Sequence, residues 1–177
     1  MGKTTLCERL LRQEPRIKAC ITATTRAPRA DEKNGRDYYF VSTEQFTKWI
    51  KQKQLIEHTK IFGAFYGTPK KSLRAIFKQG KYPLLRIDVR GAKNLKATGY
   101  QGVYIFIRPP ALKVLEARLR KRGARDKKQL TQLKIRLKRV KQELKMSRYY
   151  DFQVVNDRLD RAIKETKQIL NSQLFNK

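Results

Sequence analysis

The stretch that most constrains the fold of this chain is residues 22–40, TATTRAPRADEKNGRDYYF. It follows a short apolar segment, residues 19–21, that is typical of a β-strand. The polar run before Gly35 predicts a turn, and residues 38–41 then return to a strand-like pattern. The chain must therefore hold one loop between two strands.

That loop carries two arginines in defined backbone. Pro28 keeps the residue before it out of helical conformation, so Arg26 and Arg29 lie on extended chain. Planar guanidinium forks match the geometry of phosphate oxygens, and Tyr38 adds a hydroxyl from the returning strand. The pattern favours an oxyanion receptor, although a solvated basic loop is an equal alternative on these residues alone.

Composition bounds the class of protein. The 177 residues suit one domain, and 40% hydrophobic content is enough for a core. No apolar run is long enough for a membrane span, so we expect no membrane association. Cys7 and Cys20 lack metal-ligand spacing and a disulfide framework, which favours a reducing, cytoplasmic compartment.

The net charge of +28 is larger than binding a small anion requires. Such a surface attracts polyanions in a salt-dependent way. Aromatic residues are not interleaved with the basic ones between residues 111 and 148, where the charge is dense, so a stacking platform for single strands is missing there. We therefore expect non-specific polyanion binding at most, and the sequence leaves the oligomeric state open.

The N-terminus carries the second half of a phosphate-binding loop. Gly2, Lys3, Thr4 and Thr5 fit the end of the GxxxxGK[ST] motif, and residues 6–11 continue as an amphipathic helix. In the intact motif, backbone N–H groups cradle phosphates, the lysine reaches the outer phosphates and the hydroxyl binds Mg²⁺. The strand that normally precedes the loop is absent, so we expect the natural chain to begin upstream of Met1.

The remaining pattern alternates short strands with helices, which predicts an α/β fold. Strands are expected at residues 55–61, after the turn at 62–67, and at 84–89, 103–107 and 152–155. Helices are expected at residues 43–52, 72–79, 111–122, 129–145 and 159–170.

Five ordered motifs carry a resemblance to guanylate kinases. They are residues 22–40, then FYGTP at 65–69, IDVRG at 87–91, RLRKRG at 118–123 and VVND at 154–157. The resemblance implies a three-layer P-loop kinase fold whose first central strand is missing from this chain. It also implies a core of residues 1–30 and 81–177, a GMP-binding insert at 31–80 and a helical lid at about 118–140.

The resemblance further implies transfer of the ATP γ-phosphoryl group to GMP, with ATP and Mg²⁺ as cofactors. Each family role passes to a matching residue of this chain. The implied catalytic residues are Lys3, Arg118, Arg122 and Arg136. The implied ATP-binding residues are Gly2, Lys3, Thr4, Thr5 and Asn156, with Thr4 also on the metal. The implied GMP-binding residues are Thr22, Arg26, Arg29, Tyr38, Glu57, Tyr66, Thr68 and Asp88.

Two positions depart from the family pattern: Arg86 stands where an acid is usual, and Arg90 replaces a glutamine. A cation there disfavours metal binding by like-charge repulsion. Two other interpretations therefore remain: a catalytically silent guanylate-kinase-like binding module, and a basic nucleic-acid-binding protein on the same scaffold.

Overall fold

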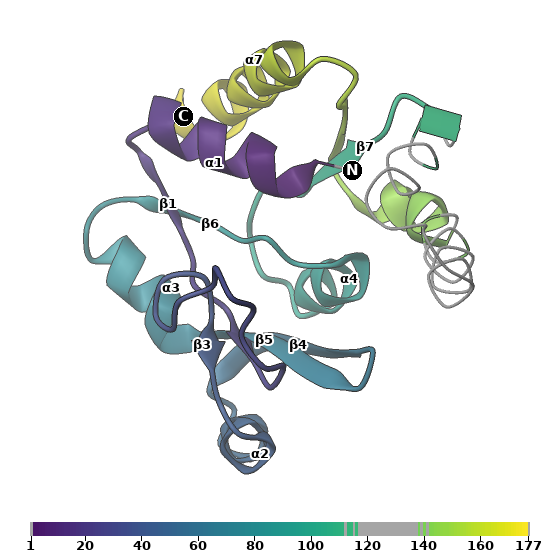
Figure 1. Cartoon of the computed structure of the whole chain (residues 1–177). Helices are drawn as coiled ribbons and strands as arrows, with labels where there is room; N and C mark the ends of the chain where they lie inside the picture. Colours follow the sequence, from purple (N-terminus) through teal and green to yellow (C-terminus); the bar gives the residue numbers. More distant parts are fainter. Residues whose placement is uncertain are drawn as a thin grey trace. The chain divides into compact units, whose positions relative to one another are not determined.

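A computed structural model describes residues 2–111, 113, 114, 116, 138, 140 and 142–176. The chain divides into two compact units, each considered by itself. The terminal unit comprises Met1–Leu10 and Gly102–Lys177, and the central unit comprises Leu11–Gln101. Helix α1 (Lys3–Gln13) runs from the first unit into the second (Figure 1).

The central unit contains two small sheets. Strands β1 (Ile17–Ala19) and β6 (Tyr82–Leu84) form a parallel pair. The larger sheet has the order β3-β2-β5-β4. Its first two strands are parallel and the other neighbouring pairs are antiparallel. The bounds are β2 (Ala23–Thr24), β3 (Tyr39–Phe40), β4 (Leu55–Ile61) and β5 (Ala64–Pro69).

Strands β4 and β5 form a hairpin with a two-residue turn. Phe62 and Gly63 have φ angles of 49° and 84°, and Ile61 pairs with Ala64 across them. Positive φ at both central residues is the type I′ geometry, whose twist matches that of the flanking strands. The turn thus fixes the register that later brings Glu57 opposite Thr68.

Three helices complete the central unit: α2 (Thr43–Lys51), α3 (Lys70–Phe77) and α4 (Val89–Ala97). The Ser42 side chain accepts a hydrogen bond from the Gln45 N–H and caps α2. Phe46 on α2 is fully buried and packs with Ala23 and Leu55 of the larger sheet. The helix thereby anchors the sheet that carries the candidate site.

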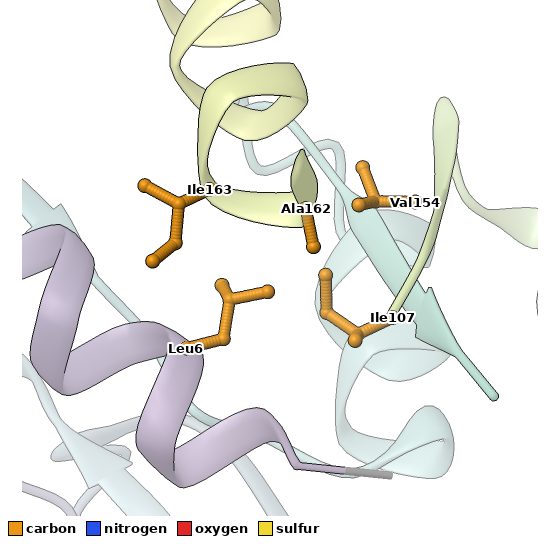
Figure 2. Packing of buried hydrophobic residues seen from close by; sticks show 5 residues of the cluster. All are labelled: Leu6, Ile107, Val154, Ala162 and Ile163. Atoms are coloured by element: carbon orange, nitrogen blue, oxygen red, sulfur yellow. The ribbon is translucent and has the colours of Figure 1, made fainter. Parts of the chain in front are cut away.

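The terminal unit contains the parallel strands β7 (Ile105–Arg108) and β8 (Phe152–Val155) and helix α7 (Leu159–Leu170). Short helical turns lie at Met146–Tyr149, before β8, and at Asn171–Phe175, after α7. Figure 2 shows how α1, α7 and both strands meet in one apolar cluster, made by Leu6, Ile107, Val154, Ala162 and Ile163. This packing fixes the N-terminal end of α1 beside the end of β8.

The predicted α/β architecture is confirmed, and β4, β8 and α7 have the predicted bounds. The predicted strand at residues 84–89 is wrong in part. Strand β6 ends at Leu84, and helix α4 begins at Val89. The Asp88 side chain accepts a hydrogen bond from the Gly91 N–H, and this N-cap turns the chain into a helix.

The expected helices at residues 111–122 and 129–145 lie largely outside the described residues. In the part of the chain that is described, no helix combines the length and the apolar character that crossing a membrane demands.

Candidate functional site

The arginine loop of the central unit is fixed to strand β5. The Thr24 hydroxyl donates to the Phe65 carbonyl at 2.9 Å and accepts from the Arg26 N–H at 3.2 Å. Thr24 is fully buried and pairs with Tyr66 across the strands. Because this pairing holds the start of the loop against β5, Arg26 lies close to Tyr66.

The Arg26 guanidinium is enclosed by aromatic rings and a carboxylate. It lies 5.6 Å from the centroid of the Tyr38 ring and 5.8 Å from that of Phe40. Its Nη2 donates to both carboxylate oxygens of Glu32, at 2.8 and 2.9 Å. The Tyr38 and Tyr66 rings meet edge to face, 6.2 Å apart. The structure therefore brings Arg26, Tyr38 and Tyr66 together.

Arg29 and Thr22 take different places. The Arg29 backbone N–H donates to Glu32 Oε2 at 2.8 Å. Its guanidinium makes no ion pair or hydrogen bond within the described part of the chain and is exposed. Thr22 lies just before β2, where its carbonyl accepts from the Tyr39 N–H. Arg29 is thus available to an anion from solvent, while the Thr22 backbone joins β2 to β3.

A buried carboxylate lies near the open end of the β4–β5 hairpin, away from its turn. Glu57 on β4 is 6% exposed, and Thr68 on β5 is fully buried. The Thr68 hydroxyl donates to Glu57 Oε1 at 2.6 Å. Burial, with a further contribution from the nearby negative charge of Asp88, raises the Glu57 pKa to about 7, against the effect of this hydrogen bond.

Helix α4 approaches Glu57 at a glycine. A Cβ atom on Gly91 would lie 2.5 Å from Glu57 Oε2 and 3.3 Å from Asp88 Oδ1. Only a glycine at this position lets the helix start lie so close to the carboxylate. Glu57, Thr68 and Asp88 therefore form one acidic cluster with a hydroxyl, suited to a ligand edge that presents hydrogen-bond donors.

In the terminal unit, the first turn of α1 lies beside Asn156. Gly2 has φ of +73°, and a Cβ there would lie 2.6 Å from the Asn156 amide nitrogen. A side chain at this position would meet both strain and a clash, so glycine is required. Lys3 follows as the first helical residue, and the Thr4 and Thr5 side chains are exposed. The first N–H groups of a helix are suited to phosphate.

Comparison with known proteins shows the family of this chain. The sequence model of the guanylate kinase family matches residues 1–173. The chain belongs to the guanylate kinase family. It is 40% identical to the guanylate kinase of Synechocystis sp. over 173 residues, 98% of this chain and 89% of that protein. It is 36% identical to that of Carboxydothermus hydrogenoformans, over 97% and 83% of the two chains.

A solved structure agrees with the sequence relatives. The crystal structure of guanylate kinase from Anaplasma phagocytophilum matches with a TM-score of 0.78 and 32% identity, covering 96% of this chain and 81% of that one. The guanylate kinase resemblance seen in the ordered motifs is thereby confirmed.

Three arginines expected from the guanylate kinase motifs lie outside the described residues: Arg118, Arg122 and Arg136. Within the described ranges, no three His, Cys, Asp or Glu side chains gather into a metal site. The Thr4 hydroxyl, exposed at the start of α1, fits a Mg²⁺ ion held mainly by a substrate's phosphates, as this ion usually is.

The sequence reasoning missed three residues that shape the candidate site. Glu32 binds Arg26, Thr24 fixes the loop to β5, and Gly91 admits Glu57 beside α4. Glu32 had a detectable signal, because it lies three residues after Arg29 in a loop that otherwise carries excess positive charge. The other two follow from pairing and packing between distant segments, which the local sequence does not show.

Proposed function

We propose that this chain is an ATP:GMP phosphotransferase, converting ATP and GMP to ADP and GDP. The observation that carries the proposal is the buried Glu57 carboxylate, held by Thr68 in the same compact unit as the Arg26, Tyr38 and Tyr66 cluster. One cluster suits a purine edge with paired donors, and the other suits a phosphate.

Guanine selection follows from the acceptor character of the first cluster. The N1–H and exocyclic amine of guanine are two adjacent donors, and ionised Glu57 offers two acceptor oxygens. Adenine presents no such pair at that edge. Asp88 supplies further acceptor charge near Glu57, and Thr68 fixes the orientation of the carboxylate. A buried acceptor left unpaired by the wrong base costs free energy, which gives the discrimination.

The acceptor phosphate is assigned to the second cluster. Arg26 and Arg29 supply planar donors, and Tyr38 and Tyr66 supply hydroxyl groups at the same loop. Holding the GMP phosphate by several fixed groups limits the orientations that its oxygens can take. This alignment accounts for a large share of rate enhancement in reactions of this kind.

The ATP phosphates are assigned to the start of α1. The helix N–H groups and the Lys3 ammonium provide positive potential there. Asn156 lies beside Gly2 and is assigned to the adenine of ATP. Mg²⁺ bound with ATP neutralises phosphate charge, and Thr4 is the residue that would hold it.

In the reaction, a GMP phosphate oxygen forms a bond to the γ-phosphorus of ATP. The bond from that phosphorus to the β–γ bridging oxygen breaks, and the electron pair leaves with ADP. Little covalent help is needed, because positioning and charge neutralisation dominate phosphoryl transfer. Arg118, Arg122 and Arg136 are proposed to neutralise charge on the transferring group, and the chain is proposed to work in the cytoplasm.

The test is a coupled assay of ADP release with GMP, IMP and AMP as acceptors, together with calorimetric binding of each. We expect turnover with GMP and a preference over AMP of about 10⁴-fold, as for a site built around hydrogen bonds. GMP binding without ADP release would identify a binding module instead. Equal binding of GMP and AMP would refute the assignment of Glu57 to guanine.

A further inference from the structure

We propose that Glu32 is a positioning residue for phosphate recognition: it holds the Arg26 guanidinium in the orientation that binds the GMP phosphate. The inference rests on the proposed function of this site. It assigns a role to a carboxylate that would at first sight oppose phosphate binding, because it places a negative charge beside the expected anion.

Glu32 contacts Arg26 through one nitrogen only. Both carboxylate oxygens accept from Nη2, at 2.8 and 2.9 Å, and Nη1 donates to the Ala27 carbonyl. The side chains of Arg26 and Glu32 are 23% and 13% exposed, so neither is free in solvent. The contact holds one end of the guanidinium plane, while the Tyr38 and Phe40 rings flank it.

The carboxylate is itself fixed by its own turn. The Arg29 N–H donates to Glu32 Oε2 at 2.8 Å, and the Glu32 N–H donates to the Arg29 carbonyl at 3.1 Å. Partial burial opposes ionisation of Glu32, but the hydrogen bonds from the Arg29 N–H and the Arg26 guanidinium outweigh it and lower its pKa. Glu32 is therefore a charged, anchored group.

These contacts favour a permanent tether over a competitor for the phosphate. To leave Arg26, the carboxylate would also have to break its bond to the Arg29 backbone. A free arginine side chain has about 2 kcal/mol of rotamer entropy, which an anion must overcome on binding. With Glu32 in place, that ordering has already occurred when GMP arrives.

The experiment is a double-mutant cycle on the full chain, using Glu32→Gln, Arg26→Ala and the double variant. Calorimetry measures Kd for GMP and for guanosine, which lacks the phosphate. The matched control is Asp31→Asn, which removes the same charge from the neighbouring position, where the side chain is exposed. Thermal unfolding of each variant verifies folding.

We expect Glu32→Gln to weaken GMP binding about tenfold, the loss typical of a charge-assisted hydrogen bond, and to leave guanosine binding unchanged. In the Arg26→Ala background the same change should have no further effect. Glu32→Asp keeps the charge but has a shorter side chain, so its affinity for GMP should lie between those of the unaltered chain and Glu32→Gln.

Three results from the variants would overturn the proposal. Tighter GMP binding by Glu32→Gln would show that the Glu32 carboxylate competes with the phosphate for Arg26. Equal weakening of GMP and guanosine binding would show a role in folding alone. Full additivity with Arg26→Ala would show that Glu32 acts independently of Arg26. If the unaltered chain binds guanosine but gains nothing from the phosphate of GMP, the phosphate site itself is misassigned, and that failure is distinct because it appears without any substitution.

Discussion

The central and terminal units hold their proposed nucleotide sites in different ways. In the central unit, side chains fix one another: Thr68 binds Glu57, and Glu32 binds Arg26. In the terminal unit, the side chains of Lys3, Thr4 and Thr5 make no hydrogen bond among the described residues, and the start of α1 is placed by backbone and packing.

The difference follows from what each site must recognise. Phosphates are bound by any helix start with free N–H groups, so the end of α1 needs a glycine and a lysine but few fixed side chains. A guanine edge differs from an adenine edge by the placement of single hydrogens, so its acceptors must be held rigidly. Substitutions in the terminal unit should therefore affect turnover, and those in the central unit should affect selectivity.

The largest expected effect tests the terminal unit. Lys3→Ala should lower kcat by about 10²–10³-fold, because it removes a fixed positive group that stabilises developing phosphate charge. GMP binding should be unchanged, since the residues assigned to GMP lie in the central unit. Steady-state kinetics and GMP calorimetry measure the two, with exposed Arg12→Ala on the same helix as the control. Loss of GMP affinity in Lys3→Ala would contradict the assignment of turnover to the terminal unit and of GMP binding to the central unit.

Glu57→Gln should lower selectivity for the acceptor, whereas Lys3→Ala lowers turnover. The amide still accepts the Thr68 hydroxyl bond but loses the charge and one acceptor oxygen, so the preference for GMP over IMP should fall about 10–100-fold. The Michaelis constant for ATP should stay the same. Initial rates with both acceptors measure the preference, and an undiminished preference would move guanine selection away from β4.

Gly91→Ala tests how tightly the central unit is built. The added methyl would lie 2.5 Å from Glu57 Oε2. Relieving that clash should lower the free energy of unfolding by about 1–3 kcal/mol and weaken guanosine binding. Gly102→Ala is the matched control, because a Cβ there meets only the Tyr104 ring at 3.9 Å. Thermal unfolding of both variants measures the effect. Equal melting temperatures would show that α4 can move to accommodate the added methyl group without loss of stability.

The smallest expected effect is a pH dependence that arises from Glu57 in the cluster formed with Thr68 and Asp88. The Glu57 pKa of about 7 means that the carboxyl is mostly neutral at pH 6 and mostly ionised at pH 8. Since guanine donors need the ionised form, guanosine affinity should rise about tenfold over that interval, one pKa unit being about 1.4 kcal/mol. Guanosine avoids titration of the phosphate, and the Glu57→Gln variant should show a flat profile.

The sequence predicted the family, the α/β fold and several elements to the residue, because these depend on local signals. The strand at 55–61 lies between clear turns, and the helix at 159–170 has a continuous apolar face. Helix α4 was missed because residues 89–97 contain a glycine and follow an apolar run that suggests a strand. Its start depends on the Asp88 cap, which competes with strand continuation at that residue.

The site shows the same division. Arg26, Tyr38 and Tyr66 could be grouped from motifs, but the partner of Arg26 could not. Glu32 belongs to a polar turn by composition, and its position against the guanidinium depends on how residues 29–32 close. The high Glu57 pKa could not be predicted from the sequence either, because it depends on burial of the side chain, to which α4, distant in the chain, contributes.

In the proposed site, the raised pKa of Glu57 would couple recognition of the base to proton exchange with solvent. A site that is half protonated at neutrality and fully ionised in the complex expels about half a proton for each nucleotide that enters. The measured heat of association should therefore vary with the ionisation enthalpy of the buffer. In a cell, acidification would therefore weaken capture of the guanine nucleotide.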